Sequence, residues 1–321
     1  GVAFVQLLPA RAKDELFDEL VDENGRAVDQ AWHERRRDLL LDAFRAAKPD
    51  AVLTETFPFG RRLLEFELAA LLDSLPRGPA RPKVIASVRD VLQRPRKDAR
   101  ALAMVARARA AYDAVIVHGD PTLLRIEQSF PEMAEIKARC IYTGYIAAST
   151  PQATNARNEV LVSAGGGAAG RALIETAIEA RAQSQLRARP WTFVSGPLSE
   201  KFEREISGGT IVRSLPDFRE RLAGAAVSVS QAGYNTLTEA VSARTPTVTV
   251  PFETDREKEQ ITRAETFAAR GLVTLVRARD LNPAALARAI DHAAETPPPR
   301  VPIDMSGREG TVRAVKTVLA Q

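Results

Sequence analysis

The chain has 321 residues, of which 45% are hydrophobic and 27% charged, a composition typical of a soluble globular protein long enough for two domains. Its apolar runs all fall short of the roughly 18 to 20 residues that a membrane span requires. The single cysteine, Cys140, cannot form an internal disulfide, so we expect a protein of the reducing cytoplasm.

The formal net charge is only +4, and the basic residues are scattered along predicted helices. Aromatic residues make up 6% of the chain and do not alternate with a basic stripe, which argues against nucleic acid as a partner. This pattern favours solvated helix faces. A peripheral contact with anionic lipid at the inner membrane stays open, and the sequence does not indicate an oligomeric state.

In the first half of the chain, short β-rich runs alternate with helical segments. The predicted strands are Gly1–Leu8, Ala51–Phe57, Lys83–Asp90, Ala114–Asp120 and Arg139–Tyr145. The predicted helices are Asp29–Lys48, Arg61–Ser74, Asp98–Tyr112 and Pro121–Gln128. Because the chain starts at Gly1 within an apolar run, we expect this domain to be partial, with an N-terminal segment absent.

A polar, turn-rich segment over 148–158 predicts a linker, after which the alternation restarts. Strands are predicted from Glu159 onward and at Trp191–Gly196, Thr210–Ser214, Val227–Gly233, Thr247–Phe252 and Leu272–Val276. Within 297–321, a proline-rich connection leads to a last helix over Arg308–Leu319, which could pack on its own domain or on the first one.

Strand–helix alternation along a whole chain predicts parallel sheets with helices on both faces. We therefore expect an α/β fold of two Rossmann-like, doubly wound domains, over 1–147 and 159–296. In this architecture the two domains would face each other across a cleft.

A glycine loop follows the first strand of the second domain, in the segment "VLVSAGGGAAG". Gly165, Gly167 and Gly170 satisfy the G-x-G-x-x-G pattern, with Gly166 between them. Glycines allow close backbone approach, and a helix N-terminus offers N–H groups and partial positive charge to a phosphate. The next predicted strand lacks the terminal carboxylate that would hold the ribose of NAD, so a diphosphate site or a plain tight turn is favoured over an NAD site.

Further along, the sequence reads "SQAGYNTLTEA", then "TPTVTVPF", then "EQITRAETFAARG". This ordered set resembles the C-terminal donor domain of the GT-B glycosyltransferases of family 28, over roughly Glu159 to Ala294. The first half, with "TETFPFGRRLLEFEL", "SVRD", "VHGDP" and "YTGY", looks like a bacterial branch of predicted glycosyltransferases. The resemblance implies the GT-B fold and transfer of a sugar from a nucleotide diphosphate sugar, usually with uracil as the base.

The resemblance also implies roles for single residues. Glu239 matches a glutamate that binds the ribose hydroxyls, and Glu259 and Gln260 match a pair that contacts the donor sugar. Because an ionised carboxylate accepts hydrogen bonds but cannot donate them, Glu259 favours a neutral hexose or N-acetylhexosamine over a uronic acid. The other implied donor-site residues are Gly165, Gly166 and Gly167 at the diphosphate, Ser214 and Leu215 at the base, and Gln231, Gly233, Tyr234 and Asn235 at the turn before the glutamate-bearing helix.

Each of these residues also has an ordinary structural interpretation. Thr236-Leu237-Thr238-Glu239 fits a capping box, in which the glutamate bonds the N-cap amide. Glu259 and Gln260 fit the solvated first turn of a helix. The residues alone leave both interpretations open.

Gln231 stands eight positions before Glu239, where retaining GT-B enzymes commonly carry a second glutamate. An amide there favours inversion, in which an acceptor hydroxyl displaces the nucleotide diphosphate in one step. The sequence has no Asp-x-Asp in a suitable position and no His/Cys cluster with metal-ligand spacing, so we predict no metal and no cofactor.

A general base is expected at the carboxyl ends of the strands in the first domain, where functional groups of parallel sheets gather. Glu55, His118 and Asp120 occupy such ends and are the candidate catalytic residues. In the family, a histidine on a loop after the very first strand also matters, so the base could instead lie in an absent N-terminal loop.

Arg89 and Asp90 lie at the end of a predicted strand, and Arg61 opens the helix that follows the strand of Glu55. These three residues are candidates for the acceptor side, where Arg61 and Arg62 would meet an anionic acceptor. The aromatic stretch around Arg61 could also be a packing anchor. Three other functions stay open: a non-catalytic nucleotide-sugar-binding subunit, a sugar-nucleotide epimerase on the same scaffold, and an NAD(P) oxidoreductase.

Overall fold

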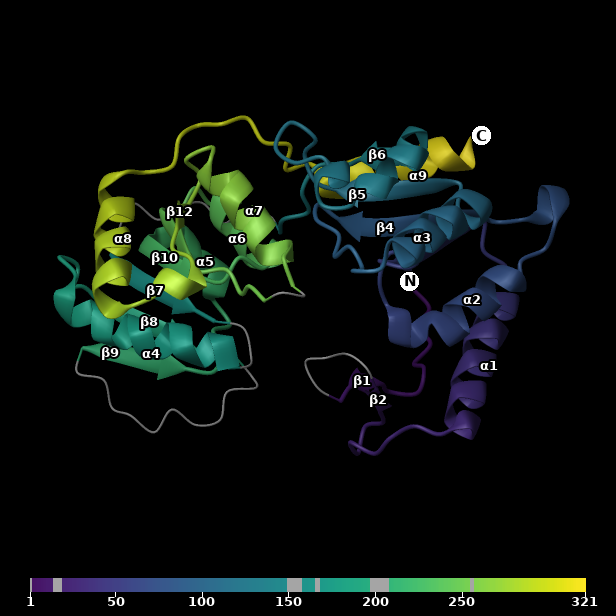
Figure 1. The fold of residues 1–321 in the computed structure, drawn as a ribbon, viewed down its shortest axis with the longest axis horizontal. Coiled ribbons are helices and arrows are strands. Elements are labelled where there is room, and N and C mark those ends of the chain that lie inside the picture. The colour runs from purple at the N-terminus through teal and green to yellow at the C-terminus, as the bar shows by residue number, and fades with distance from the viewer. Residues whose placement is uncertain (1, 14–18, 149–157, 165–167, 197–207, 255–256) are drawn as a thin grey trace. The chain divides into compact units, whose positions relative to one another are not determined.

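A computed structural model describes residues 2–13, 19–148, 158–164, 168–196, 208–254 and 257–321 (Figure 1). The chain divides into two compact units. The first holds Gly1–Val117, Phe130–Tyr142 and Thr311–Gln321, and the second holds His118–Ser129 and Thr143–Gly310. Most of the predicted linker over 148–158 lies outside the described residues.

The first unit is built on a four-stranded sheet in the order β3-β4-β5-β6. These strands are β3 (Ala51–Glu55), β4 (Lys83–Arg89), β5 (Ala114–His118) and β6 (Cys140–Tyr142). The α-helix α1 (Gln30–Ala47) precedes β3, and α2 (Glu65–Asp73) and α3 (Asp98–Ala111) lie between the strands in the sequence. Asp29 caps α1 by accepting a 2.7 Å bond from the Trp32 amide. The predicted strands and helices of this region are confirmed, apart from the two that follow.

The predicted strand at the start of the chain is wrong. Residues 2–8 are not in a strand, and Val2 and Phe4 are 98% and 81% exposed. An apolar run forms a strand only where a neighbouring strand satisfies its backbone groups. The first strands are instead the short antiparallel pair β1 (Arg11–Ala12) and β2 (Leu20–Val21).

The predicted helix over Pro121–Gln128 is also wrong, since only η3 (Ile126–Gln128) forms a short 3₁₀ turn there. Asp120 Oδ1 accepts bonds from the Thr122 amide at 2.8 Å and from its hydroxyl at 2.7 Å. Such local bonds offer the backbone an alternative to a helix. The other 3₁₀ segments are η1 (Arg62–Leu64), η2 (Gly78–Ala80), η4 (Pro131–Arg139) and η5 (Ala278–Asp280).

The second unit is built on a six-stranded parallel sheet in the order β12-β11-β10-β7-β8-β9. Its strands are β7 (Glu159–Ser163), β8 (Trp191–Val194), β9 (Gly209–Val212), β10 (Ala225–Ser230), β11 (Thr247–Thr249) and β12 (Thr274–Leu275). The chain moves outward from β7 to β9 and then returns to the other side of β7 with β10. The strand order therefore reverses between β7 and β10, as in a doubly wound nucleotide-binding domain.

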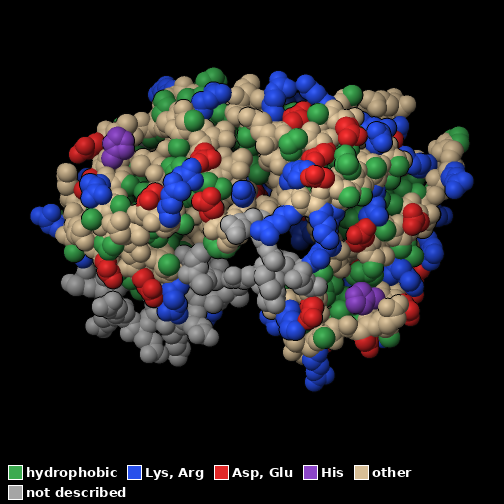
Figure 2. Space-filling model, in the orientation of Figure 1, with side chains coloured by type: hydrophobic (Ala, Val, Ile, Leu, Met, Phe, Trp, Pro, Cys, Tyr) green, Lys and Arg blue, Asp and Glu red, His purple; other side chains and the backbone are tan. Residues whose placement is uncertain are grey.

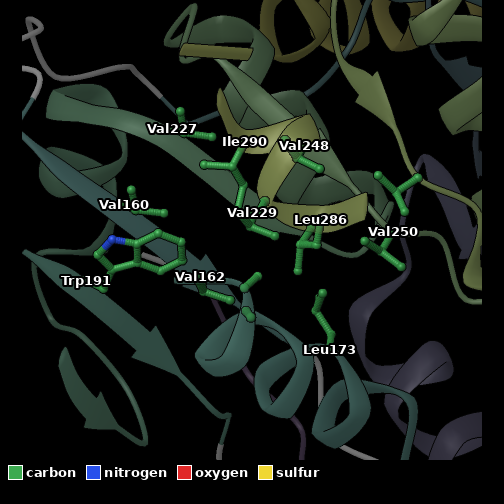
Figure 3. Close-up of a cluster of buried hydrophobic side chains, with 14 of the residues drawn as sticks. Val160, Val162, Leu173, Trp191, Val227, Val229, Val248, Val250, Leu286 and Ile290 are labelled. Atoms are coloured by element: carbon green, nitrogen blue, oxygen red, sulfur yellow. The ribbon is translucent and has the colours of Figure 1, made fainter. Parts of the chain in front are cut away.

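Helices cover both faces of this sheet. They are α4 (Ala168–Gln183), α5 (Phe218–Gly224), α6 (Tyr234–Ser242), α7 (Glu259–Ala268) and α8 (Pro283–Glu295). On one face, Val160, Val162 and Val229 pack against Leu173 of α4 and Leu286 of α8 (Figure 3). On the other face, alternate strand residues pack against α5 and α6.

The last helix, α9 (Gly307–Leu319), ends in the first unit. Ala314 and Val318 pack with Ile85 of β4 and Ile116 of β5, so the second of the two alternatives for this helix is confirmed. At its start, a Cβ on Gly310 would lie 2.0 Å from the Thr143 carbonyl oxygen, which leaves space only for glycine.

Candidate functional site

The reversal between β7 and β10 places the carboxyl ends of these two strands side by side, with Ser230 of β10 paired to Ser163 of β7. In the sequence, α4 follows β7 and α6 follows β10. Ligands of doubly wound sheets bind outside the carboxyl ends of the strands at the point of reversal. The predicted diphosphate residues Gly165, Gly166 and Gly167 come between β7 and α4 in the sequence and lie outside the described residues.

Helix α6 begins at Tyr234, with Gly233 as its N-cap and no side-chain capping bond. The capping-box interpretation of Thr236 and Glu239 is therefore wrong, because Thr236 already lies inside the helix. Glu239 lies in the second turn rather than the first. Its carboxylate has no part in starting the helix.

The carboxylate of Glu239 is half-buried, and its side chain is 23% exposed. Burial raises its pKa, and the positive charge of Arg219, whose Nε lies 3.5 Å from Glu239 Oε1, lowers it in part. Arg219 belongs to α5, so two helices on the same face of the sheet bring the pair together. A carboxylate that is partly desolvated in this way gains from hydroxyl donors that a ligand supplies.

Gln260 joins the turns that follow β10 and β11. Its Oε1 accepts bonds from the amides of Ala232 at 3.1 Å and of Phe252 at 3.0 Å. Two N–H donors identify this atom as the oxygen, so Nε2 remains to donate. Gln260 is the second residue of α7, and the helix thus fixes both turns at the edge of the sheet.

Glu259, the first residue of α7, accepts a 2.8 Å bond from Arg263 one turn later. The Arg263 side chain has no exposed area, and its Nη1 donates to the Ala232 carbonyl at 3.0 Å. Arg263 was missed in the sequence analysis. Its spacing of four residues from Glu259 is the signal that could have indicated it.

Tyr234 connects α6 to two other segments of the second unit. Its hydroxyl donates to the His118 carbonyl at 3.0 Å and accepts from the Ile146 amide at 3.0 Å. Tyr234 is only 4% exposed, so its hydroxyl holds these segments together and is not a contact for solvent.

The imidazole of His118 is 8% exposed, and burial lowers its pKa. Its Nδ1 lies 2.9 Å from the Thr143 hydroxyl, and that hydroxyl donates to the Gly144 carbonyl at 3.3 Å. The hydroxyl oxygen therefore accepts from Nδ1–H. In the tautomer that matches this arrangement, Nε2 is the basic nitrogen of a neutral imidazole.

Asp120 has a different environment. Oδ1 accepts the two bonds from Thr122, and Oδ2 accepts a 2.9 Å bond from the Asp304 amide. Burial by itself would raise the pKa of Asp120, but these bonds, with the charge of Arg270, outweigh it and hold the pKa below its usual value. Both oxygens hold the chain together, as expected of a structural carboxylate.

The remaining predicted donor residues take varied positions in the second unit. Gln231 directly follows β10, and Asn235 is exposed on the first turn of α6. Ser214 is exposed and Leu215 half-buried in the loop between β9 and α5, at an edge of the sheet. The predicted base-contact residues thus follow β9, which lies two strands away from β7, where the order reverses.

In the first unit, the loop after β3 is strained. Thr56 and Arg61 have φ angles of 66° and 56°, a left-handed conformation that costs a non-glycine residue energy. Phe57 and Phe59 are each 2% exposed and anchor the loop, while Thr54 donates to the Phe57 carbonyl at 2.8 Å. Strain of this kind persists where the surroundings fix it and is common at functional sites.

This loop presents Glu55 and Arg61 as an exposed ion pair, with Nη2 and Oε2 2.6 Å apart. Thr56 donates to the Ser87 carbonyl at 2.8 Å, so the loop adjoins the end of β4. There Arg89 is exposed and Asp90 has no exposed area. The predicted acceptor-side residues therefore belong to one edge of one sheet.

Positive and negative side chains are interspersed over the face seen in Figure 2. No helix among the described residues is long and apolar enough to cross a membrane. In the same part of the chain, no three His, Cys, Asp or Glu side chains are grouped so that they could hold a metal ion.

The geometry of the second unit agrees with comparisons to known proteins. Residues 160–316 match the model of the glycosyltransferase family 28 C-terminal domain. This region is a family 28 C-terminal domain. A protein of Methanopyrus kandleri named an uncharacterized glycosyltransferase is 32% identical over 160 residues, which is 50% of this chain and 44% of that protein. The match thus spans less than half the length of this relative.

Solved structures extend the likeness to both units. MurG of Acinetobacter baumannii matches with a TM-score of 0.54 and 16% identity, over 92% of this chain and 82% of that one. The spinosyn rhamnosyltransferase SpnG complexed with thymidine diphosphate matches with a TM-score of 0.56 and 14% identity, over 90% and 74%. At this identity the likeness concerns the fold, and the fold is GT-B. The family 28 C-terminal domain forms its second half.

Proposed function

We propose that the chain is a glycosyltransferase that moves a hexose or N-acetylhexosamine from a UDP-linked donor to an acceptor hydroxyl, with inversion and without a metal. The observation that carries this proposal is the arrangement beside the reversal of strand order. There the half-buried carboxylate of Glu239 and the amide of Gln260 are held on the helices that follow neighbouring strands.

In this proposal Glu239 accepts hydrogen bonds from the ribose hydroxyls, which compensate the desolvation that raises its pKa. Gln260 donates through Nε2 to the donor sugar while its oxygen holds two turns in place. Glu259 accepts from a sugar hydroxyl with the oxygen that Arg263 does not bind. The N-termini of α4 and α6 favour the diphosphate.

His118 is the proposed general base. In the reaction, the acceptor oxygen attacks the anomeric carbon as the bond to the diphosphate breaks, and the nucleoside diphosphate leaves with the electron pair. Nε2 of His118 takes the acceptor proton, because a neutral imidazole is available at neutral pH. The engaged oxygens and lowered pKa of Asp120 make it a weaker candidate. Gln231, a neutral residue after β10, supports inversion.

The comparisons support the same function. The relative from Methanopyrus kandleri is named a glycosyltransferase, and SpnG is a glycosyltransferase with a bound nucleoside diphosphate. For the acceptor, we propose that the strained loop with Arg61, together with Arg89 and Asp90, contacts it. Glu55 is paired with Arg61, so it would orient the acceptor rather than act as the base.

The test is a thermal-shift panel of UDP, TDP, GDP, ADP and NAD on the whole chain, with Glu239→Ala and the exposed control Glu220→Ala. We expect UDP to raise the melting temperature most in the wild type and in the control, and the shift to shrink in Glu239→Ala. A shift with NAD alone would refute the proposal. Interconversion of a UDP-sugar without an acceptor would indicate an epimerase instead.

A further inference from the structure

A pocket of about 290 Å³ lies in the second unit at the end of α6 that is remote from Gly233. Its lining residues come from the end of α6, the turn after α7 and the connection after α8: Val241, Ser242, Arg244, Leu272, Pro298, Pro299, Arg300, Val301, Ile303 and Met305. The lining is mostly apolar, with two arginines.

The pocket is separate from the proposed donor site. Helix α6 starts after the carboxyl end of β10 and returns to the amino end of β11, where Ser228 donates to the Pro246 carbonyl at 2.8 Å. Arg244 lies just before that point. The pocket is therefore at the opposite edge of the sheet from Gln260.

The connection after α8 forms one wall of the pocket and is held in place by packing. Val301, Ile303 and Met305 pack against the buried cluster that contains Phe267. Gly271 has a φ of 68°, and a Cβ there would contact Pro299 at 3.6 Å. Two adjacent prolines also restrict the backbone. The hollow is thus bounded by packed elements.

Arg244 occupies a backbone position that normally favours glycine. The Thr245 amide bonds the Ala240 carbonyl and the Arg244 amide bonds the Val241 carbonyl, each at 3.0 Å, which is the Schellman motif that ends α6. Arg244 is its left-handed residue, with a φ of 54°. An arginine is strained where glycine would be relaxed, so replacement of Arg244 by glycine should not destabilise the fold.

We propose that this pocket binds an alkyl phosphate, with the chain against the apolar walls and the phosphate between Arg244 and Arg300. Guanidinium groups bind phosphate oxygens in a bidentate manner. A phosphate monoester carries a charge of about −1.5 to −2 at neutral pH, which two arginines balance better than they balance a carboxylate. This inference does not rest on the proposed glycosyl transfer.

The experiment measures binding of decyl phosphate to the whole chain by calorimetry, below the micelle concentration. Inorganic phosphate, decanoate and decyl maltoside serve as comparison probes. We expect saturable binding of decyl phosphate at one site, weaker binding of decanoate, and no measurable binding of inorganic phosphate or the maltoside. Octyl phosphate should bind more weakly, by up to about fourfold per methylene removed.

Arg244→Gly is the decisive variant because glycine suits the left-handed position, so the fold should be as stable as the wild type or more stable. It should weaken decyl phosphate binding by at least about tenfold, as should Arg300→Gln. Arg288→Gln, an exposed arginine on α8, is the control and should bind as the wild type does.

UDP affinity should be the same in all four proteins, because the pocket and the donor site lie at opposite edges of the sheet. Equal decyl phosphate affinity in wild type and Arg244→Gly would overturn the proposal. The proposal would also be overturned if decyl maltoside bound as tightly as decyl phosphate, or if decyl phosphate showed no saturable binding. Binding to anionic lipid vesicles without binding of monomeric decyl phosphate would likewise overturn it and would indicate a membrane-binding surface.

Discussion

The guanidinium of Arg263 lies 5.5 Å from the centroid of the Tyr234 ring, in a position with no solvent exposure. This contact joins α7 to Tyr234, the first residue of α6, and the same arginine also binds Glu259. Because Tyr234 also bonds the His118 carbonyl, the proposed sugar contacts and the proposed base belong to one connected set of side chains. A cation–π contact that is removed from water is stronger than an exposed one.

Replacement of Arg263 should therefore affect stability first. We expect Arg263→Met to lower the free energy of unfolding by about 2–4 kcal/mol, since it leaves Glu259 and the Ala232 carbonyl without their partner. Chemical denaturation measures this loss, and Arg288→Met, on the exposed face of α8, is the control. A loss no larger than that of the control would show that Arg263 does not anchor α7.

Glu239→Ala should weaken UDP binding by about 1.5–3 kcal/mol, the range for hydrogen bonds to a charged group. Because Gly233 caps the helix, no capping bond is lost, and the thermal stability of the free protein should stay close to that of the wild type. Calorimetric titration with UDP measures the first effect. Unchanged affinity would contradict the ribose role.

The α/β alternation of the second unit followed from periodicity and turn residues, but the bounds of its strands did not: the run predicted over Val227–Gly233 forms β10 over Ala225–Ser230. The strand predicted at the start of the chain was wrong, because Val2 and Phe4 are apolar but exposed and are not part of a strand. The position of Asp120 after a strand suggested a catalytic role, but its bonds to Thr122 and Asp304 use both carboxylate oxygens. The sequence could not show this, because Asp304 lies 184 residues further along the chain.

In the candidate site, too, some residues could be predicted from the sequence and others could not. Glu239 and Gln260 could be named from their motifs, but whether Glu239 caps its helix depended on where the helix begins. The helix begins at Tyr234, whose hydroxyl bonds the backbone of His118 and of Ile146, and these partners are distant in sequence. Arg263 was overlooked because an arginine on a helix is ordinarily solvated.

The strained loop of the first unit gives a test that separates stability from function. Arg61→Gly should leave the free energy of unfolding unchanged or raise it by up to about 1 kcal/mol, because glycine suits a positive φ. Transfer activity should nevertheless fall if the loop contacts the acceptor. Lys48→Gly is the matched control, since Lys48 has a φ of 43° at the end of α1. Equal activity in both variants would exclude the loop from the acceptor site.

The pH dependence follows from His118. Burial lowers its pKa from the ordinary value of 6.5, so the folded protein binds fewer protons than the unfolded chain at this group. The contribution of His118 to stability is full above the ordinary pKa and is lost progressively as the pH falls from that value through the lower pKa of the folded state. The acid limb of kcat/KM should likewise lie below pH 6.5.

His118→Asn should remove this part of the pH dependence of stability and lower kcat by about 10²–10⁴-fold, the usual contribution of a general base. His292→Asn, at an exposed position of α8, should change neither. If His118→Asn keeps the activity of the wild type, the base is another group.

The last prediction concerns the donor sugar. Glu259 keeps one oxygen for a sugar hydroxyl, and its charge disfavours a second carboxylate nearby, so we expect neutral donors to be preferred over UDP-glucuronic acid. Glu259→Gln should change the order of preference among UDP-glucose, UDP-galactose, UDP-N-acetylglucosamine and UDP-glucuronic acid while it leaves UDP affinity nearly unchanged. Competition assays on both proteins measure the order. Gln260→Glu, which keeps an acceptor for the amides of Ala232 and Phe252 but removes the Nε2 donor, should weaken every UDP-sugar relative to UDP. If the uronate is the best donor of the wild type, or if Glu259→Gln leaves the order as it was, then Glu259 does not contact the sugar and serves only to hold Arg263.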